Sequence, residues 1–222
     1  MELIYPTAPR RLQPADIPGY DATIAGDAAT SDYRAWWQRS SGTGEYLGLE
    51  EGLAAIGAAI RDAGGVDGVV GFSQGGAAAA MVASLLEDGR AEAFDAAAQS
   101  SGGIKYPNSF LGERSASTAA MPSHGRLKFA VIYSGFYASY PPYEAFYEPK
   151  IKTPMLHFIG SLDSVVEESR SLALVNACTD ARVIYHPGGH FVPIGKDMVG
   201  QLVAFIRGAC RESAEITKEG TE

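Results

Sequence analysis

Hydrophobic residues follow two patterns in turn along the chain: a helical period of three to four residues in some segments, and short continuous runs in others. In residues 46–63 they recur every three or four positions, which predicts an amphipathic helix that ends at Gly64 and Gly65. The apolar face of this helix consists of Leu49, Leu53, Ile56 and Ile60. Short runs rich in β-branched and aromatic residues predict buried strands at residues 68–72, 129–134, 155–159 and 182–186. Further helices are predicted at residues 76–87, 169–177 and 196–207.

Short apolar strands that alternate with helices predict an α/β fold, with a mostly parallel sheet flanked by helices. A length of 222 residues favours a single domain over residues 1–222. The weakly patterned parts are expected to be an irregular segment (residues 7–43), a long flexible insertion (residues 91–126) and a frayed tail (residues 211–222). Residues 2–5 are apolar and predict one more short strand, which Pro6 ends.

Composition narrows the possible partners. The formal net charge is −8 and no stretch is rich in Lys or Arg, so a nucleic-acid partner is not expected. Because the N-terminus lacks a signal-peptide pattern and no apolar run is long enough to span a bilayer, we expect a cytoplasmic protein with no membrane partner. The two cysteines, Cys178 and Cys210, lie far apart and have no metal-ligand spacing, so we expect neither a metal site nor a disulfide framework.

The sequence Gly71-Phe72-Ser73-Gln74-Gly75 carries the strongest chemical signal. It lies between a predicted strand and a predicted helix, which is the context that a G-x-S-x-G nucleophile elbow requires. In such an elbow the serine hydroxyl projects from a strained turn, and glycines such as Gly71 and Gly75 remove the Cβ atoms where strand and helix come close. The alternative interpretation is an ordinary Gly/Ser turn in which Ser73 caps the helix.

Asp163 and His190 lie in loops just past two other predicted strands. Since the carboxyl ends of parallel strands meet at one edge of a sheet, both are expected beside Ser73, in the Ser…Asp…His order of α/β-hydrolases. His190 would then act as the base, Asp163 would orient and stabilise its imidazole, and the backbone N–H of Gln74 would be one oxyanion donor.

The sequence leaves alternative assignments open for the acid and the base. Asp163 also fits a turn residue near a helix start, and His190 fits a loop residue beside the Gly188-Gly189 turn. Asp67 and Asp197 are rivals for the acid, although neither follows a strand. The remaining histidines, which are weaker candidates for the base, are His124, His157 and His186.

With these motifs the chain resembles the FSH serine hydrolases, small α/β-hydrolases that are common in fungi. The matching segments cover most of the chain in the family's order: residues 34–37, 50–53, 67–75, 131–136, 160–163 and 186–193. The resemblance implies hydrolysis of a carboxylic ester or acyl thioester without a metal or organic cofactor. For several fungal relatives it implies partnership with a polyketide synthase, whose acyl carrier domain would present the substrate.

Two aromatic segments are candidates for the wall of an acyl pocket. They contribute Trp36, Trp37, Phe136 and Tyr137. The alternative is that these side chains simply pack in the core.

The chain also departs from the family pattern. The family begins with an apolar strand, a His-Gly loop and a helix, whereas this sequence begins near the second family strand, at residues 2–5. The loop would supply the second oxyanion donor. A second hypothesis is therefore a catalytically impaired hydrolase fold that serves as a binding or scaffold protein.

Overall fold

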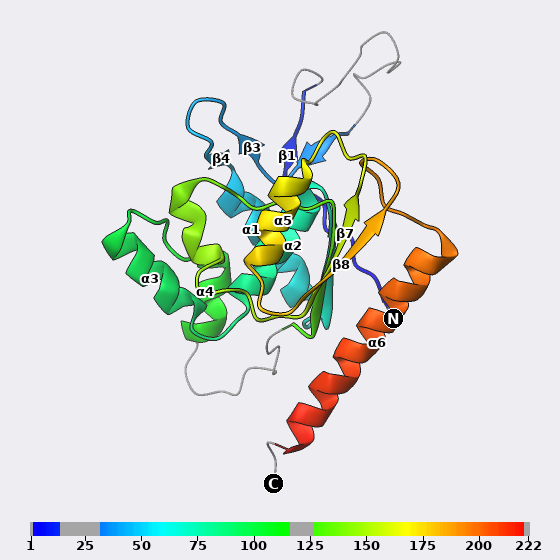
Figure 1. The fold of residues 1–222 in the computed structure, drawn as a ribbon. Coiled ribbons are helices and arrows are strands. Elements are labelled where there is room, and N and C mark those ends of the chain that lie inside the picture. The colour runs from blue at the N-terminus through cyan, green and yellow to red at the C-terminus, as the bar shows by residue number, and fades with distance from the viewer. Residues whose placement is uncertain (1, 14–31, 116–126, 220–222) are drawn as a thin grey trace.

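A parallel sheet forms the centre of the computed structural model, which describes residues 2–13, 32–115 and 127–219 (Figure 1). Its strands lie in the order β5-β6-β7-β8. They are β5 (Gly68–Phe72), β6 (Phe129–Tyr133), β7 (Met155–Gly160) and β8 (Ala181–His186). Each strand lies within one residue of the bounds predicted from its apolar run, and all three pairings are parallel. The prediction of a mostly parallel sheet is confirmed.

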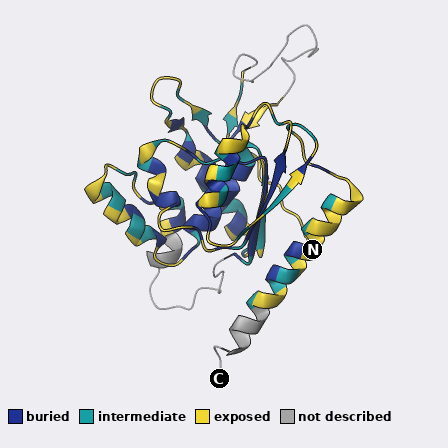
Figure 2. Ribbon diagram, in the orientation of Figure 1, coloured by how far each residue is buried: buried dark blue, intermediate teal, exposed yellow. Residues whose placement is uncertain are grey.

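Helices cover both faces of the sheet, and the two faces are covered unequally. One face packs against α1 (Leu49–Asp62), α2 (Gln74–Leu85), α3 (Arg90–Ser100), α5 (Glu168–Asn176) and the 3₁₀ helix η3 (Pro141–Phe146). In the described part of the chain, the opposite face packs against one helix, α6 (Lys196–Glu219). Figure 2 shows buried residues gathered in the sheet and in α2, whereas much of α6 is exposed.

Alternation along β6 explains how one strand serves both faces. Ala130 and Ile132 belong to the larger core, while Phe129, Val131 and Tyr133 belong to the smaller core under α6. All five residues are buried because a central parallel strand has helices on either side. This is why the strand reads as a continuous apolar run in the sequence.

The irregular segment expected at residues 7–43 contains short antiparallel pairings. β1 (Arg10–Arg11) pairs with β2 (Arg34–Ala35), and β3 (Gln38–Arg39) pairs with β4 (Tyr46–Leu47). Residues 14–31 lie outside the described residues.

The prediction of a strand at residues 2–5 is wrong. These residues have no strand pairing among the described parts of the chain, and Leu3, Ile4 and Tyr5 are 56%, 48% and 81% exposed. A short apolar run becomes a strand only where a neighbouring strand pairs with its backbone, which the run itself cannot specify.

The insertion expected at residues 91–126 is largely helical in its described part. It contains α3 and α4 (Asn108–Ser115), which bury Phe94 and Phe110, and Tyr106 between them is also buried. One large buried apolar residue per helix leaves too little periodicity to detect in the sequence, although it anchors each helix. Residues 116–126 lie outside the described residues.

The frayed tail expected from Arg211 is helical as far as Glu219, because α6 continues without a break. Phe205 and Ala209 are buried against the sheet, and neither proline nor a run of glycines interrupts the helix after them. Among the residues described here, no helix is long and apolar enough to cross a membrane.

Candidate active site

Ser73 lies in a strained turn between β5 and α2. Its φ and ψ are 54° and −120°, a conformation that few non-glycine residues adopt, and its N–H donates to Tyr133 O at 2.8 Å. Its side chain makes no capping hydrogen bond to α2, so the interpretation of Ser73 as a side-chain helix cap is wrong. The turn instead directs the hydroxyl toward the edge of the sheet where β7 and β8 also end.

The glycines of the turn have different steric roles. A Cβ on Gly71 would overlap the backbone at Gly75 and Gly76, so strand and helix can approach only if residue 71 is glycine. A Cβ on Gly75 would meet only Trp36 Nε1, at 3.7 Å, which is an ordinary contact. The tight position after the serine is Gly76, whose Cβ would lie 3.0 Å from Gly135 Cα.

His190 and Asp163 form a hydrogen-bonded chain with Ser73. His190 Nε2 lies 2.9 Å from Ser73 Oγ, and His190 Nδ1 lies 2.8 Å from Asp163 Oδ2. The His190 side chain is 17% exposed and that of Asp163 is 3% exposed. The structure therefore brings together three side chains that are separated by up to 117 positions in the sequence.

The surroundings of Asp163 favour its ionised form. Burial raises the pKa of this carboxyl, but the Val166 N–H, His190, Ser134 and the Val165 N–H together outweigh burial, and its pKa is lowered. Asp163 Oδ1 accepts hydrogen bonds from the N–H groups of Val165 and Val166, both at 2.9 Å. Asp163 is therefore both a turn residue, as the alternative had it, and a partner of His190.

The rival acids lie elsewhere. Asp67 precedes β5, at the opposite edge of the sheet, and pairs with Lys128 at 2.6 Å. Asp197 lies in the first turn of α6. Of the other histidines, His157 is buried within β7 and His186 is buried at the end of β8, where its ring packs against Phe191. His124 lies outside the described residues.

Gln74 connects the nucleophile turn to residues 36–37. As the first residue of α2, it has a backbone N–H without a partner inside the helix, as the predicted oxyanion donor requires. Its side-chain Oε1 accepts from the Trp36 N–H at 2.8 Å, and its Nε2 donates to Trp37 O at 2.9 Å. No pattern in the sequence indicated this second, side-chain role.

The four aromatic candidates for an acyl wall divide into different environments. Trp36 is partly buried beside Gly75, whereas Trp37 is 2% exposed and stacks on Tyr46 with ring centroids 4.8 Å apart. Phe136 lies under the Arg170 guanidinium at 4.3 Å, and Tyr137 packs on Tyr147 at 4.2 Å. Core packing describes Trp37 well, while Trp36 is the candidate that the structure brings to the nucleophile turn.

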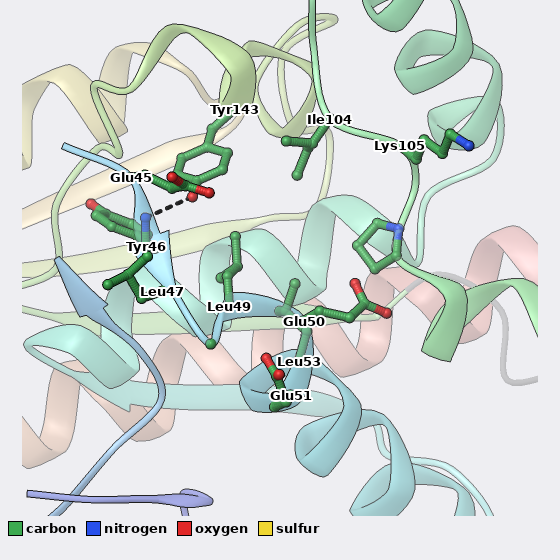
Figure 3. Close-up of a pocket in the computed structure, with 12 residues that line it drawn as sticks. Glu45, Tyr46, Leu47, Leu49, Glu50, Glu51, Leu53, Ile104, Lys105 and Tyr143 are labelled. Carbon is green, nitrogen blue, oxygen red and sulfur yellow. Dashed lines mark hydrogen bonds between the residues drawn. The ribbon is translucent and has the colours of Figure 1, made fainter. Parts of the chain in front are cut away.

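A pocket of about 350 Å³ is lined in part by Tyr46 (Figure 3), whose ring also stacks on Trp37. Tyr46, Leu49, Leu53 and Tyr143 contribute apolar walls, and the Tyr46 N–H donates to Tyr143 Oη at 2.8 Å. Ser73, Asp163 and His190 are not among the described residues that line it. Among the described residues, no group of three or more His, Cys, Asp or Glu side chains is arranged to hold a metal ion.

Ser134, which lowers the pKa of Asp163, was not among the residues that the sequence singled out. Ser134 directly follows β6, is 2% exposed and has a φ of 45°. The apolar run predicted a strand through residue 134 and so placed Ser134 inside it, whereas the strand ends at Tyr133.

Comparison with known proteins identifies the family. The family model for the serine hydrolases described as Serine hydrolase (FSH1) matches residues 1–202. The chain belongs to this family. Within it, the chain is similar to family of serine hydrolases 2 of Saccharomyces cerevisiae, with 29% identity over 93% of this chain and 83% of that protein. It is also similar to esterase OVCA2 of Danio rerio, with 30% identity over 87% of this chain and 77% of that protein.

Other similarities concern part of a longer protein or the fold alone. A dihydrofolate reductase of Schizosaccharomyces pombe is 33% identical over 71% of this chain, which spans only 29% of that protein. The crystal structure of esterase PE8 superposes with a TM-score of 0.51 at 21% identity, covering 92% of this FSH1-family chain and 76% of the esterase. This likeness supports the α/β-hydrolase fold.

Proposed function

We propose that this protein is a serine esterase or thioesterase that works through an acyl-enzyme on Ser73. The observation that carries the proposal is the continuous chain from Ser73 Oγ to His190 Nε2 and from His190 Nδ1 to Asp163 Oδ2, at 2.9 and 2.8 Å. Membership of the serine hydrolase (FSH1) family and the esterase names of relatives support it.

The first half-reaction follows from where the proton can go. A serine hydroxyl is a weak nucleophile at neutral pH, so His190 Nε2 takes the hydroxyl proton as Ser73 Oγ bonds to the substrate carbonyl carbon. The Asp163 carboxylate stabilises the imidazolium that forms. The Gln74 N–H donates to the negatively charged carbonyl oxygen of the tetrahedral intermediate.

The first half-reaction ends when the bond from the carbonyl carbon to the leaving oxygen or sulfur breaks, the leaving group takes the proton from His190 Nε2, and the acyl group remains on Ser73 Oγ. The second half-reaction regenerates the enzyme. His190 removes a proton from water, the water oxygen attacks the acyl carbon, and the bond to Ser73 Oγ breaks as His190 returns the proton to Ser73. The products are a carboxylic acid and an alcohol or thiol.

Labelling with a fluorophosphonate probe tests the nucleophile. The wild-type protein should be labelled, Ser73→Ala should not, and Ser100→Ala, which alters an exposed serine on α3, should behave as wild type. An unlabelled wild-type protein would instead support the alternative of a binding or scaffold protein with impaired catalysis.

A second variant tests the acid. Asp163→Asn should fold yet lower kcat for p-nitrophenyl esters by about 10³- to 10⁴-fold, because the imidazole is then held in the wrong tautomer. Asp88→Asn, at an exposed position, is the matched control. A change smaller than tenfold would remove Asp163 from the proposed mechanism.

The acyl group is a separate question. The resemblance to fungal relatives extends the proposal to thioesters on a polyketide synthase carrier domain. Hydrolysis rates for p-nitrophenyl esters and acyl thioesters of graded length, free and carrier-bound, would test this extension. A carrier-bound thioester that reacts no faster than the free one would refute it.

A further inference from the structure

Two serines occupy equivalent, strained positions at the ends of adjacent strands. In the described parts of the chain, Ser73 and Ser134 are the two non-glycine residues with positive φ, at 54° and 45°. Phe72 and Tyr133 are register partners in the parallel pairing of β5 and β6, so the next residue of each strand is one of the two serines. Backbone strain of this kind persists where the surrounding structure holds it, and it concentrates at active sites.

The backbone fixes Ser134 between the other two strands of the site. The Ser73 N–H donates to Tyr133 O at 2.8 Å, and the Ser134 N–H donates to Phe158 O of β7 at 2.9 Å. Asp163 follows the end of β7. Ser134 therefore lies between the strand that presents the proposed nucleophile and the strand that leads to the proposed acid.

The Ser134 hydroxyl is buried without a conventional partner. The residue is 2% exposed, and its Oγ makes no hydrogen bond of standard geometry with any other described residue. It lies near enough to Asp163 to lower the pKa of that carboxyl. A buried hydroxyl without a hydrogen bond is costly, so its presence calls for an explanation.

Glycine would serve the turn itself better than serine. A φ near +45° costs glycine little, and a turn without a chemical task gains nothing from a buried hydroxyl there. The neighbouring residue, Gly135, has no such freedom, because a Cβ there would overlap Ile132. At position 134, serine therefore costs the fold both backbone strain and the burial of a hydroxyl, and it places that hydroxyl beside Asp163.

We propose that Ser134 is a positioning residue whose hydroxyl donates a hydrogen bond to the Asp163 carboxylate and holds it in line with His190 during turnover. The inference rests on the proposed function, since it assigns Ser134 to the same site. The other hydrogen bonds to Asp163 come from the Val165 and Val166 N–H groups on one oxygen and from His190 on the other. The Ser134 hydroxyl adds a donor that remains in place when the imidazole becomes charged.

Two substitutions separate this role from a structural one. Ser134→Ala removes the hydroxyl and keeps the strain, whereas Ser134→Gly removes the hydroxyl and relieves the strain. Ser84→Ala is the matched control, because the Ser84 hydroxyl is also buried and without a hydrogen bond but lies near the C-terminal end of α2, away from Ser73 at its start. The measurements are kcat and KM with p-nitrophenyl esters, together with the melting temperature.

Both Ser134 variants should lower kcat roughly tenfold, the loss expected for a hydrogen bond to a charged group, while KM changes less than twofold. Ser134→Gly should melt at the same temperature as wild type or higher, so that stability and turnover move apart. Ser84→Ala should retain wild-type kcat. Wild-type kcat in Ser134→Gly, alongside an inactive Ser73→Ala, would overturn the inference and leave the proposed function intact. Full activity in Ser73→Ala would overturn the proposed function and the inference with it.

Discussion

At the scale of single residues, Gln74 has two tasks that use different atoms. Its backbone N–H lies at the start of α2, where the proposed function needs a donor, and its side chain binds the backbone of Trp36 and Trp37. Because one residue carries both, the position of the Trp36–Trp37 segment and the position of the proposed oxyanion donor are linked. A Cβ on Gly52 of α1 would overlap the Trp36 carbonyl, so this segment is held from a second side as well.

Replacing Gln74 should loosen this link. Gln74→Leu keeps a similar volume but leaves the Trp36 N–H and the Trp37 carbonyl without their side-chain partners. Two partly buried hydrogen-bonding groups left unpaired should lower the free energy of unfolding by about 2 kcal/mol. Urea unfolding followed by tryptophan fluorescence measures this change. Gln99→Leu, on the exposed face of α3, should change stability by less than about 0.5 kcal/mol. Equal effects of the two substitutions would contradict the role of the Gln74 side chain.

The site residues differ in how readable they are from sequence. Ser73 directly follows β5, Asp163 and His190 lie in the loops just past β7 and β8, and parallel strands bring such positions to one edge. Ser134 follows a strand too, but its significance depends on φ and on the nearness of Asp163, which only the fold determines. The Gln74 side-chain contacts span 37 and 38 positions and leave no local pattern.

At the scale of elements, a buried ion pair joins the end of α2 to the start of α3. Arg90 and Glu87 are 1% and 5% exposed, and Arg90 Nη2 lies 2.9 Å from Glu87 Oε2. Arg90 also donates to the carbonyls of Ala145 and Pro149, while Glu87 Oε1 accepts from the backbone N–H groups of residues 152 and 153. The pair thus connects the start of α3 to the backbone at Ala145, Pro149 and residues 152–153, although α3 itself has a weak apolar pattern.

Breaking this pair should destabilise the protein strongly. Arg90→Met leaves the Glu87 carboxylate buried without a positive partner, which typically costs about 3–5 kcal/mol. Arg207→Met, on the exposed side of α6, is the matched control and should have little effect.

The double variant Glu87→Gln/Arg90→Met separates charge from packing. It removes both charges, and the glutamine oxygen can still accept the two backbone N–H groups, so it should recover much of the loss. Unfolding free energies of the single and double variants give the coupling. A double variant no more stable than Arg90→Met would show that lost packing, and not the unpaired charge, accounts for the cost.

Elements were predicted well where packing leaves a regular pattern. β6 and β7 are buried on both faces and read as unbroken apolar runs, and α1 shows its apolar face every third or fourth residue. α3 escaped prediction because Phe94 is its one large buried apolar residue. The run at residues 2–5 looked like a strand because apolar composition is local, whereas pairing depends on a partner elsewhere in the chain.

At the scale of the whole molecule, the buried core contains a basic group that folding must keep neutral. His157 lies in β7, in the middle of the sheet, and is 1% exposed. Burial lowers its pKa from 6.5 to about 4. The Cys178 sulfur lies 4.0 Å from its Nε2. Among the described residues, no carboxylate forms an ion pair with this imidazole.

The direction of the resulting pH dependence follows from proton binding. Between about pH 4 and 6.5 the unfolded chain binds a proton at this histidine and the folded protein does not, so stability rises with pH in that window and falls on acidification. Going from pH 7 to pH 4.5, this one group should lower the free energy of unfolding by about 2 kcal/mol. His157→Gln has no such proton to bind, so urea unfolding at intervals of pH should give a shallower acid slope, whatever the substitution does to stability at pH 7. The carboxylates are common to both proteins, and the difference between the two slopes therefore isolates His157. Parallel slopes for wild type and variant would mean that the folded protein accommodates the charged imidazole, and that acid unfolding has its origin outside the centre of the sheet.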